Sequence, residues 1–132
     1  MKYMLDTNIC IYAMKKNMPL LQELLAKDPA DMCISSIALS ELLFGIEKSK
    51  RKESNKQILL SFLSNLTILN YDENAALEYA TLRNNLENSG TPIGAMDMLI
   101  AAHALSKNLV LITNNEKEFN RIKNLEIENW TN

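Results

Sequence analysis

The strongest strand signal in this chain is the apolar run Leu109-Val110-Leu111-Ile112, which the polar residues Thr113-Asn114-Asn115 follow directly. A short apolar run containing β-branched residues is typical of a strand buried on both faces of a parallel sheet. The preceding segment, residues 95–106, has the pattern of a helix, and a turn with a short helix is predicted over residues 113–119. This region therefore predicts an α/β fold.

The rest of the chain repeats the same alternation of strand and helix. We expect further strands at residues 2–5, 32–35 and 67–69, and a small edge strand beginning at Ile127. We expect further helices at residues 9–16, 19–27, 36–50, 53–66 and 72–88. Strands that alternate with helices predict a parallel β-sheet flanked by helices on both faces, in which ligands bind beyond the carboxyl ends of the strands.

Length and composition indicate one domain over residues 1–132 and exclude several classes of protein. The chain is 47% hydrophobic and 23% charged, which is ordinary for a globular domain. No apolar run reaches the ~20 residues of a membrane helix, and Asp6 interrupts any signal-peptide core, so we expect a cytoplasmic protein with no membrane partner. Cys10 and Cys33 lie in apolar surroundings and are expected to be reduced core thiols.

Net charge is −2, so no global excess of basic residues indicates nucleic-acid binding. Any RNA contact must depend on a local patch, a bridging metal or a second subunit. The basic run at residues 48–56 is a solvated helix end or, in a ribonuclease, a phosphate contact. His103 is the only histidine, and we expect a structural role for it.

Asp6 directly follows the first expected strand and would lie at the carboxyl edge of the sheet. An N-cap for the next helix is the simpler explanation, because Asp is a favoured cap. Thr7 and Asn8 could serve as caps equally well, so capping alone does not require an Asp here.

Glu41 lies in the apolar stretch at residues 37–46. Its neighbours three and four residues away on a helix are Ile37, Ala38, Phe44 and Gly45. A carboxylate in such surroundings must be paired or protonated, because an unpaired buried charge is costly. The alternative is a surface Glu on a narrow wet edge of the helix.

Asp97 falls in the first turn of the helix expected at residues 95–106, where the helix dipole favours an acid. Its neighbours Ile93, Gly94, Ile100 and Ala101 nevertheless place it on a face that should pack. The polar cluster at residues 113–119 follows the strongest strand and reaches the same edge of the sheet.

These acids come from distant parts of the chain but are expected at one edge of one sheet. Carboxylates so placed repel one another and raise each other's pKa values unless a cation neutralises them. Oxygen ligands without His or Cys select Mg²⁺, or Mn²⁺, over zinc. The pattern therefore indicates a site that holds phosphate and activates water.

Four ordered motifs resemble PIN-domain toxins of the VapC family, and the likeness runs from Lys2 through Trp130. The motifs are Met4-Leu5-Asp6-Thr7-Asn8, Ser40-Glu41-Leu42 with Gly45, Ile93-Gly94 with Asp97 and Ile100-Ala101, and Thr113-Asn114-Asn115 with Glu118-Phe119. The resemblance implies a PIN-like α/β/α fold and a Mg²⁺-dependent endoribonuclease toxin whose metal-binding and catalytic acids are Asp6, Glu41 and Asp97. Its expected substrate is RNA, with tRNA the favoured class.

The same resemblance implies partners for the chain. It predicts a homodimer, a VapB-like antitoxin that neutralises the toxin, and a larger hetero-oligomer of the two. The tail of the antitoxin would lie in a groove on the toxin, and operator DNA would be bound only through the antitoxin. We expect part of the apolar surface of residues 19–27 and 58–63 to serve these contacts.

The fourth acidic position departs from the commoner family pattern. Many PIN domains carry Asp two residues after the threonine that matches Thr113, but this chain has Asn115 there. A subgroup uses a later Glu, which would be Glu118. We therefore predict that Glu118 completes the catalytic and metal-binding set, with Asn8, Thr113 and Asn115 in support.

Two other functions fit part of the pattern. A phosphatase or phosphotransferase could use Asp6 as a nucleophile on a similar sheet, although the haloacid-dehalogenase pattern requires a second Asp where this chain has Asn8. An inactive PIN-like module that only binds partners is the other alternative, and the intact acids at positions 6, 41 and 97 are evidence against it.

Overall fold

A computed structural model describes residues 1–132, and its five strands form one parallel sheet. The strand order is β3-β2-β1-β4-β5, so β1 is central and the connections reverse direction between β1 and β4. The strands are β1 (Tyr3–Leu5), β2 (Met32–Ser35), β3 (Thr67–Leu69), β4 (Val110–Ile112) and β5 (Ile127–Glu128). In sheets of this kind the crevice at such a reversal is the usual ligand site.

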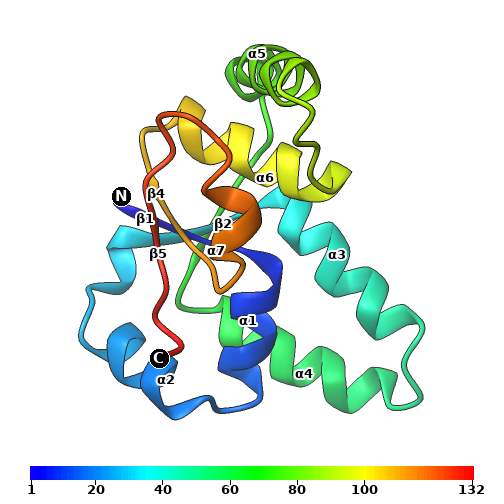
Figure 1. The fold of residues 1–132 in the computed structure, drawn as a ribbon. Coiled ribbons are helices and arrows are strands. Elements are labelled where there is room, and N and C mark those ends of the chain that lie inside the picture. Colours follow the sequence, from blue (N-terminus) through cyan, green and yellow to red (C-terminus); the bar gives the residue numbers. More distant parts are fainter.

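Helices cover both faces of the sheet. In Figure 1, α5 and α6 lie above the strands, α1 and α2 lie below them, and α3 and α4 extend to one side as a pair. The helices are α1 (Thr7–Met14), α2 (Met18–Leu25), α3 (Ser36–Glu47), α4 (Lys52–Leu63), α5 (Glu73–Asn88), α6 (Ala95–Ser106) and α7 (Glu116–Phe119), with a 3₁₀ turn η1 at Pro29–Asp31. This arrangement is the α/β/α fold that the alternating pattern predicted.

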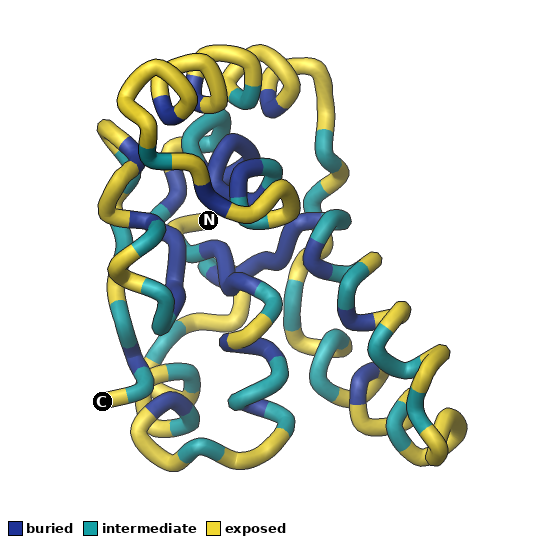
Figure 2. The backbone as a smooth tube through the Cα atoms, turned by 45° about the vertical axis from the view of Figure 1, so that its right-hand side comes forward, coloured by how far each residue is buried: buried dark blue, intermediate teal, exposed yellow.

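The core lies between the sheet and the helices packed against it. The central strands β1 and β2 are almost wholly buried, whereas α5 presents a long exposed face (Figure 2). Helix α6 is buried over most of its length, which explains why its sequence is apolar nearly all round. Trp130 packs edge-on against Tyr3, with ring centroids 5.0 Å apart, and both cysteines are free and buried. No helix is long and apolar enough to cross a membrane.

Several helices begin or end a few residues from the predicted positions. Residues 9–16 were too late for the first helix, because the Asp6 side chain caps it and α1 begins at Thr7. Asn17 likewise caps α2, which therefore starts before Pro19 and ends at Leu25. Helix α3 ends at Glu47 rather than near residue 50, and α4 spans Lys52–Leu63 rather than residues 53–66. Capping side chains therefore set the starts of α1 and α2.

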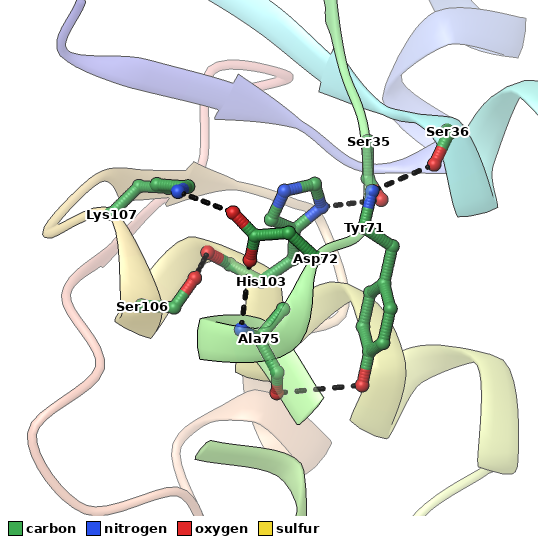
Figure 3. Close-up of polar contacts among 8 residues, drawn as sticks. All are labelled: Ser35, Ser36, Tyr71, Asp72, Ala75, His103, Ser106 and Lys107. Atoms are coloured by element: carbon green, nitrogen blue, oxygen red, sulfur yellow. Dashed lines mark hydrogen bonds and ion pairs between the residues drawn. The ribbon is translucent and has the colours of Figure 1, made fainter. Parts of the chain in front are cut away.

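A buried polar cluster anchors the junction between β2 and α3 (Figure 3). Ser35 caps α3 by accepting a hydrogen bond from Ile37 N, and its Oγ lies 2.7 Å from His103 Nδ1 on α6. Ser36 Oγ accepts a further bond from Tyr71 N. His103 is fully buried and therefore has the structural role predicted for it. These contacts fix the start of the helix that carries Glu41.

Candidate active site

Asp6 lies at the carboxyl end of β1, where it is only 4% exposed. Its Oδ1 accepts a hydrogen bond of 2.8 Å from Ile9 N, which makes it the N-cap of α1. Burial raises the pKa of Asp6 above its ordinary value, although hydrogen bonds from the Thr113 side chain and from backbone groups oppose the rise. The charge of Glu41 raises the pKa further. Asp6 is therefore both a structural cap and a member of a cluster of acids.

Glu41 projects from α3, and its side chain is half-buried. The Thr7 hydroxyl donates a hydrogen bond of 2.5 Å to Glu41 Oε1 and so joins α1 to α3. This bond supplies the pairing that the apolar surroundings of Glu41 required. No protein group donates to the other carboxylate oxygen, Oε2.

Asp97 lies in the first turn of α6, whose N-cap residue is Gly94. Burial raises the pKa of Asp97 from its ordinary 3.8 to about 6, and the charges of Asp6, Glu118 and Glu41 add to the rise. A Cβ atom on Gly94 would lie 3.5 Å from Asp97 Oδ2, in ordinary van der Waals contact. The charges of Asp6, Glu118 and Glu41 therefore lie close enough to Asp97 to act on its carboxyl group.

The fourth side of the site is formed by the segment after β4. Thr113 is buried, and its Oγ1 accepts a hydrogen bond from Asn115 N. Asn115 Nδ2 in turn donates a bond of 3.1 Å to Glu118 Oε2. Glu116, by contrast, is exposed and accepts a bond from Asn129 Nδ2 outside the cluster. Of the two glutamates in the first turn of α7, the structure therefore brings only Glu118 toward Asp97.

The donor set has the chemistry of a hard divalent cation site. It consists of carboxylates, with neither His nor Cys among them, and this composition favours Mg²⁺ or Mn²⁺. No group of three or more His, Cys, Asp or Glu side chains forms a ready-made cage for a metal ion. This openness is compatible with Mg²⁺, which usually keeps several water ligands and binds few carboxylates directly. Binding of a metal ion by these carboxylates stays a prediction.

Comparison with known proteins identifies the family. The PIN domain family matches residues 3–125. Ribonuclease VapC2 of Rickettsia felis is 50% identical, over 98% of this chain and 98% of its own length. The chain is a PIN-domain protein of the VapC ribonuclease family. The tRNA(fMet)-specific endonuclease VapC of Salmonella typhimurium is 44% identical, again over 98% of both chains.

The solved structures of the VapC family agree with this fold. The DNA-bound VapBC structure from Salmonella typhimurium contains a chain that matches with a TM-score of 0.94 and 43% identity. The match covers 98% of each chain. The predicted PIN-like α/β/α architecture is thereby confirmed.

The structure places the predicted supporting residues at different distances from the acids. Asn115 bonds to Glu118, and the Thr113 side chain lowers the pKa of Asp6. Asn8 has an exposed side chain, and its link to the site is a backbone hydrogen bond to Asp6. The roles of all these residues in catalysis and metal binding stay predictions.

Sequence reasoning missed two long-range contacts made by α1, and only the first of them reaches one of the acids of this VapC-family site. It treated Thr7 only as an alternative cap, but its hydroxyl binds Glu41. It assigned no role to Tyr12, whose hydroxyl accepts a bond of 3.1 Å from Asn114 Nδ2 across the chain. Both contacts join residues far apart in sequence, and no local pattern indicates them.

Proposed function

We propose that this chain is an endoribonuclease toxin that depends on Mg²⁺ or Mn²⁺ and cleaves tRNA. The observation that carries the proposal is the convergence of Asp6, Glu41, Asp97 and Glu118 at the carboxyl edge of the sheet. The resemblance to a tRNA(fMet)-specific endonuclease supports tRNA as the substrate class. Cleavage of tRNA would arrest translation, and the site of action would then be the cytoplasm.

The four acids differ in how the protein restrains them. Asp6 is held rigidly by its cap bond, and Thr7 and Asn115 restrain Glu41 and Glu118 through one oxygen each. Burial and the charges of the other acids raise the pKa of Asp97 to about 6, so it takes up a proton more readily than an ordinary carboxyl group. A bound Mg²⁺ would supply Lewis-acid stabilisation of the phosphodiester and lower the pKa of a coordinated water.

Two measurements in bacteria test this function: growth after induced expression, and sequencing of RNA ends. Induced expression of the unmodified chain should stop growth, and Asp6→Ala should relieve the arrest. Sequencing of RNA ends after a short pulse of expression should show new tRNA ends that are absent with the variant. Normal growth without new ends, at protein levels matched to a known VapC toxin, would favour the inactive binding module instead.

We also propose that a VapB-like antitoxin binds a groove beside the acids. This groove has a volume of about 340 Å³ and lies between α1, α3 and α4. Its lining is largely apolar and includes Ile11, Leu42, Ile46 and Ile58, with Glu41 also on its wall. An apolar segment of the antitoxin in the groove would therefore lie against a residue of the active site. Ile58 belongs to the apolar surface that the sequence assigned to partners.

Gly45 offers a direct test of the groove. It also lines the groove, and a Cβ atom added there would meet nothing within 4 Å. Gly45→Leu should add bulk to the groove from a position where its Cβ meets no clash, and should abolish capture of the co-expressed antitoxin. Ala80→Leu adds similar bulk to an exposed face of α5 and should leave capture intact. Equal capture by both variants would contradict the assignment of this groove.

A homodimer is the remaining part of the proposal. Helix α2 exposes 61% of Met18 and 86% of Leu25, more apolar surface than a lone domain would be expected to leave open. A dimer would assemble with the antitoxin into a larger complex, and operator DNA would bind through the antitoxin. Support for the DNA contact comes from the DNA-bound VapBC complex of Salmonella typhimurium. A strictly monomeric mass at high concentration would contradict the dimer.

A further inference from the structure

We propose that Thr7 is a positioning residue that holds Glu41 in the geometry needed to bind the metal ion. The inference rests on the proposed metal-dependent function and adds a residue to it. Its basis is the hydrogen bond from Thr7 Oγ1 to Glu41 Oε1, which spans 34 positions of the chain. In this role Thr7 acts through Glu41.

The geometry of this bond is that of a charge-assisted interaction. An oxygen–oxygen distance of 2.5 Å falls in the range typical of a hydroxyl that donates to a carboxylate. The side chains of both partners are half-buried, so water competes for the bond only in part. The bond therefore restrains a long side chain that would otherwise adopt several rotamers.

The bond also determines which oxygen Glu41 can offer. Oε1 accepts from Thr7, and Oε2 has no protein donor. Glu118 is arranged in the same way, because Asn115 engages its Oε2. Each glutamate is thus tethered through one oxygen and keeps the other for a cation or a water molecule. A cluster of like charges needs such restraint, because repulsion would otherwise turn flexible carboxylates outward.

The position of Thr7 explains why the tether is precise. It is the first residue of α1, directly after the capping residue Asp6. The bond that Asp6 accepts from Ile9 N fixes the start of α1. Asp6 is itself one of the acids, and the hydroxyl of the next residue, Thr7, holds a second acid, Glu41. Ser35 and His103 likewise fix the start of α3, the helix that carries Glu41. The bond joins two independently anchored helices.

Binding of Mn²⁺ to the purified full chain, measured by calorimetry without RNA, tests this role. Thr7→Val removes the hydroxyl at nearly constant volume and should weaken Mn²⁺ binding about tenfold or more, as loss of a group that orients a metal ligand commonly does. Thr7→Ser keeps the hydroxyl and should bind Mn²⁺ close to the unmodified protein. Cleavage of tRNA should follow the same order, and raised Mn²⁺ concentration should restore much of the Thr7→Val activity.

Tyr12→Phe is the matched control. It removes another hydroxyl from α1 that bonds across the chain, to Asn114, but that hydroxyl bonds to no acid. Mn²⁺ binding should be unchanged in this variant, whatever it does to the free energy of unfolding. If Thr7→Val fails to fold, Thr7→Ala provides the same loss of the hydroxyl with less apolar bulk.

Two results would overturn the proposal. One is Mn²⁺ binding by folded Thr7→Val, or by Thr7→Ala, that equals binding by the unmodified chain. The other is equal weakening by Thr7→Val and Thr7→Ser, which would assign the effect to packing rather than to the hydroxyl. If the unmodified chain itself neither binds Mn²⁺ nor cleaves tRNA, the proposed function fails, and this inference fails with it.

Discussion

Asn115 donates a hydrogen bond of 3.1 Å from its side-chain amide to Glu118 Oε2, and this contact joins the two candidates for the fourth position of the site. The amide at position 115 does not replace the missing carboxylate; it orients one that comes three residues later. Helix α7 begins at Glu116, so Asn115 precedes its first turn and Glu118 lies within that turn. The charge of Glu118 raises the pKa of Asp97, whereas the charge of Glu116 does not.

The first prediction concerns this pair of glutamates. Glu118→Gln should slow tRNA cleavage about tenfold or more and raise the Mg²⁺ concentration needed for half-maximal rate. The reason is the loss of one charge from the site, with the fold kept. Glu116→Gln is the control, because its carboxylate is exposed and bonds to Asn129. Unmodified rates and Mg²⁺ dependence in Glu118→Gln would show that the other three acids suffice.

The second prediction concerns Asp97 and the stability of the metal-free protein. Its pKa of about 6 in the folded state exceeds the ordinary 3.8, so the folded chain binds the proton more tightly than the unfolded chain. Stability is therefore lost as pH rises from about 4 to about 6, and the full penalty is present above that range. Asp97→Asn should remove the penalty and raise the free energy of unfolding at neutral pH by about 1–2 kcal/mol, allowing for solvent screening.

Urea unfolding in EDTA across this pH range measures the effect. The advantage of Asp97→Asn should shrink as pH falls toward 4, where the unmodified Asp97 is also neutral. It should also shrink when Mg²⁺ is added, since a cation neutralises the cluster. Glu116→Gln again serves as the control, and an Asp97→Asn variant that is no more stable than this control at neutral pH would contradict the account.

The third prediction concerns His103, which lies on α6, is fully buried and contacts Ser35 (Figure 3). Burial lowers the pKa of His103 below its ordinary 6.5, and the nearby Lys107 lowers it further, whereas Asp72 and the Asn70 backbone oppose the shift. No group makes a hydrogen bond of good geometry to its Nε2. Protonation therefore favours the unfolded chain, and the free energy of unfolding should fall as pH drops below about 6.5.

Asp97 titrates in the lower part of the same range with the opposite sign, so the measurement belongs in an Asp97→Asn background. There the slope of stability against pH between about 5 and about 7 should be positive, and His103→Gln should flatten it. The test compares the slopes of unfolding free energy against pH, so it is informative even if His103→Gln lowers stability at every pH. A slope that is the same with and without His103 would show that another group is responsible.

The order of the elements could be predicted from local pattern, and the ends of the helices only in part. The apolar run ending at Ile112 and the strand at Met32–Ser35 are local signals, and both were placed correctly or within one residue. The start of α1 was missed because Asp6, Thr7 and Asn8 are all good caps, and only the folded backbone selects among them. The central place of β1 in the sheet is a property of pairing between distant strands, which no local pattern indicates.

The residues of the site could likewise be predicted only in part from the local sequence pattern. The apolar surroundings of Glu41 indicated a paired or protonated acid, and the structure supplies a partner for it. The identity of that partner, Thr7, could not be predicted, because it depends on how α1 and α3 pack. His103 was correctly assigned a structural role, but its contact with Ser35 joins residues 68 positions apart and required the fold.

The most direct test of the central claim is cleavage of purified initiator tRNA by the purified chain in Mg²⁺, in EDTA, and in EDTA followed by excess Mg²⁺. The account predicts cleavage in Mg²⁺, none in EDTA and recovery when Mg²⁺ is restored. Asp6→Asn, Glu41→Gln and Asp97→Asn, each folded, should be largely inactive under all three conditions. Undiminished cleavage in EDTA, or full activity of these variants, would contradict a metal-dependent ribonuclease built on these acids.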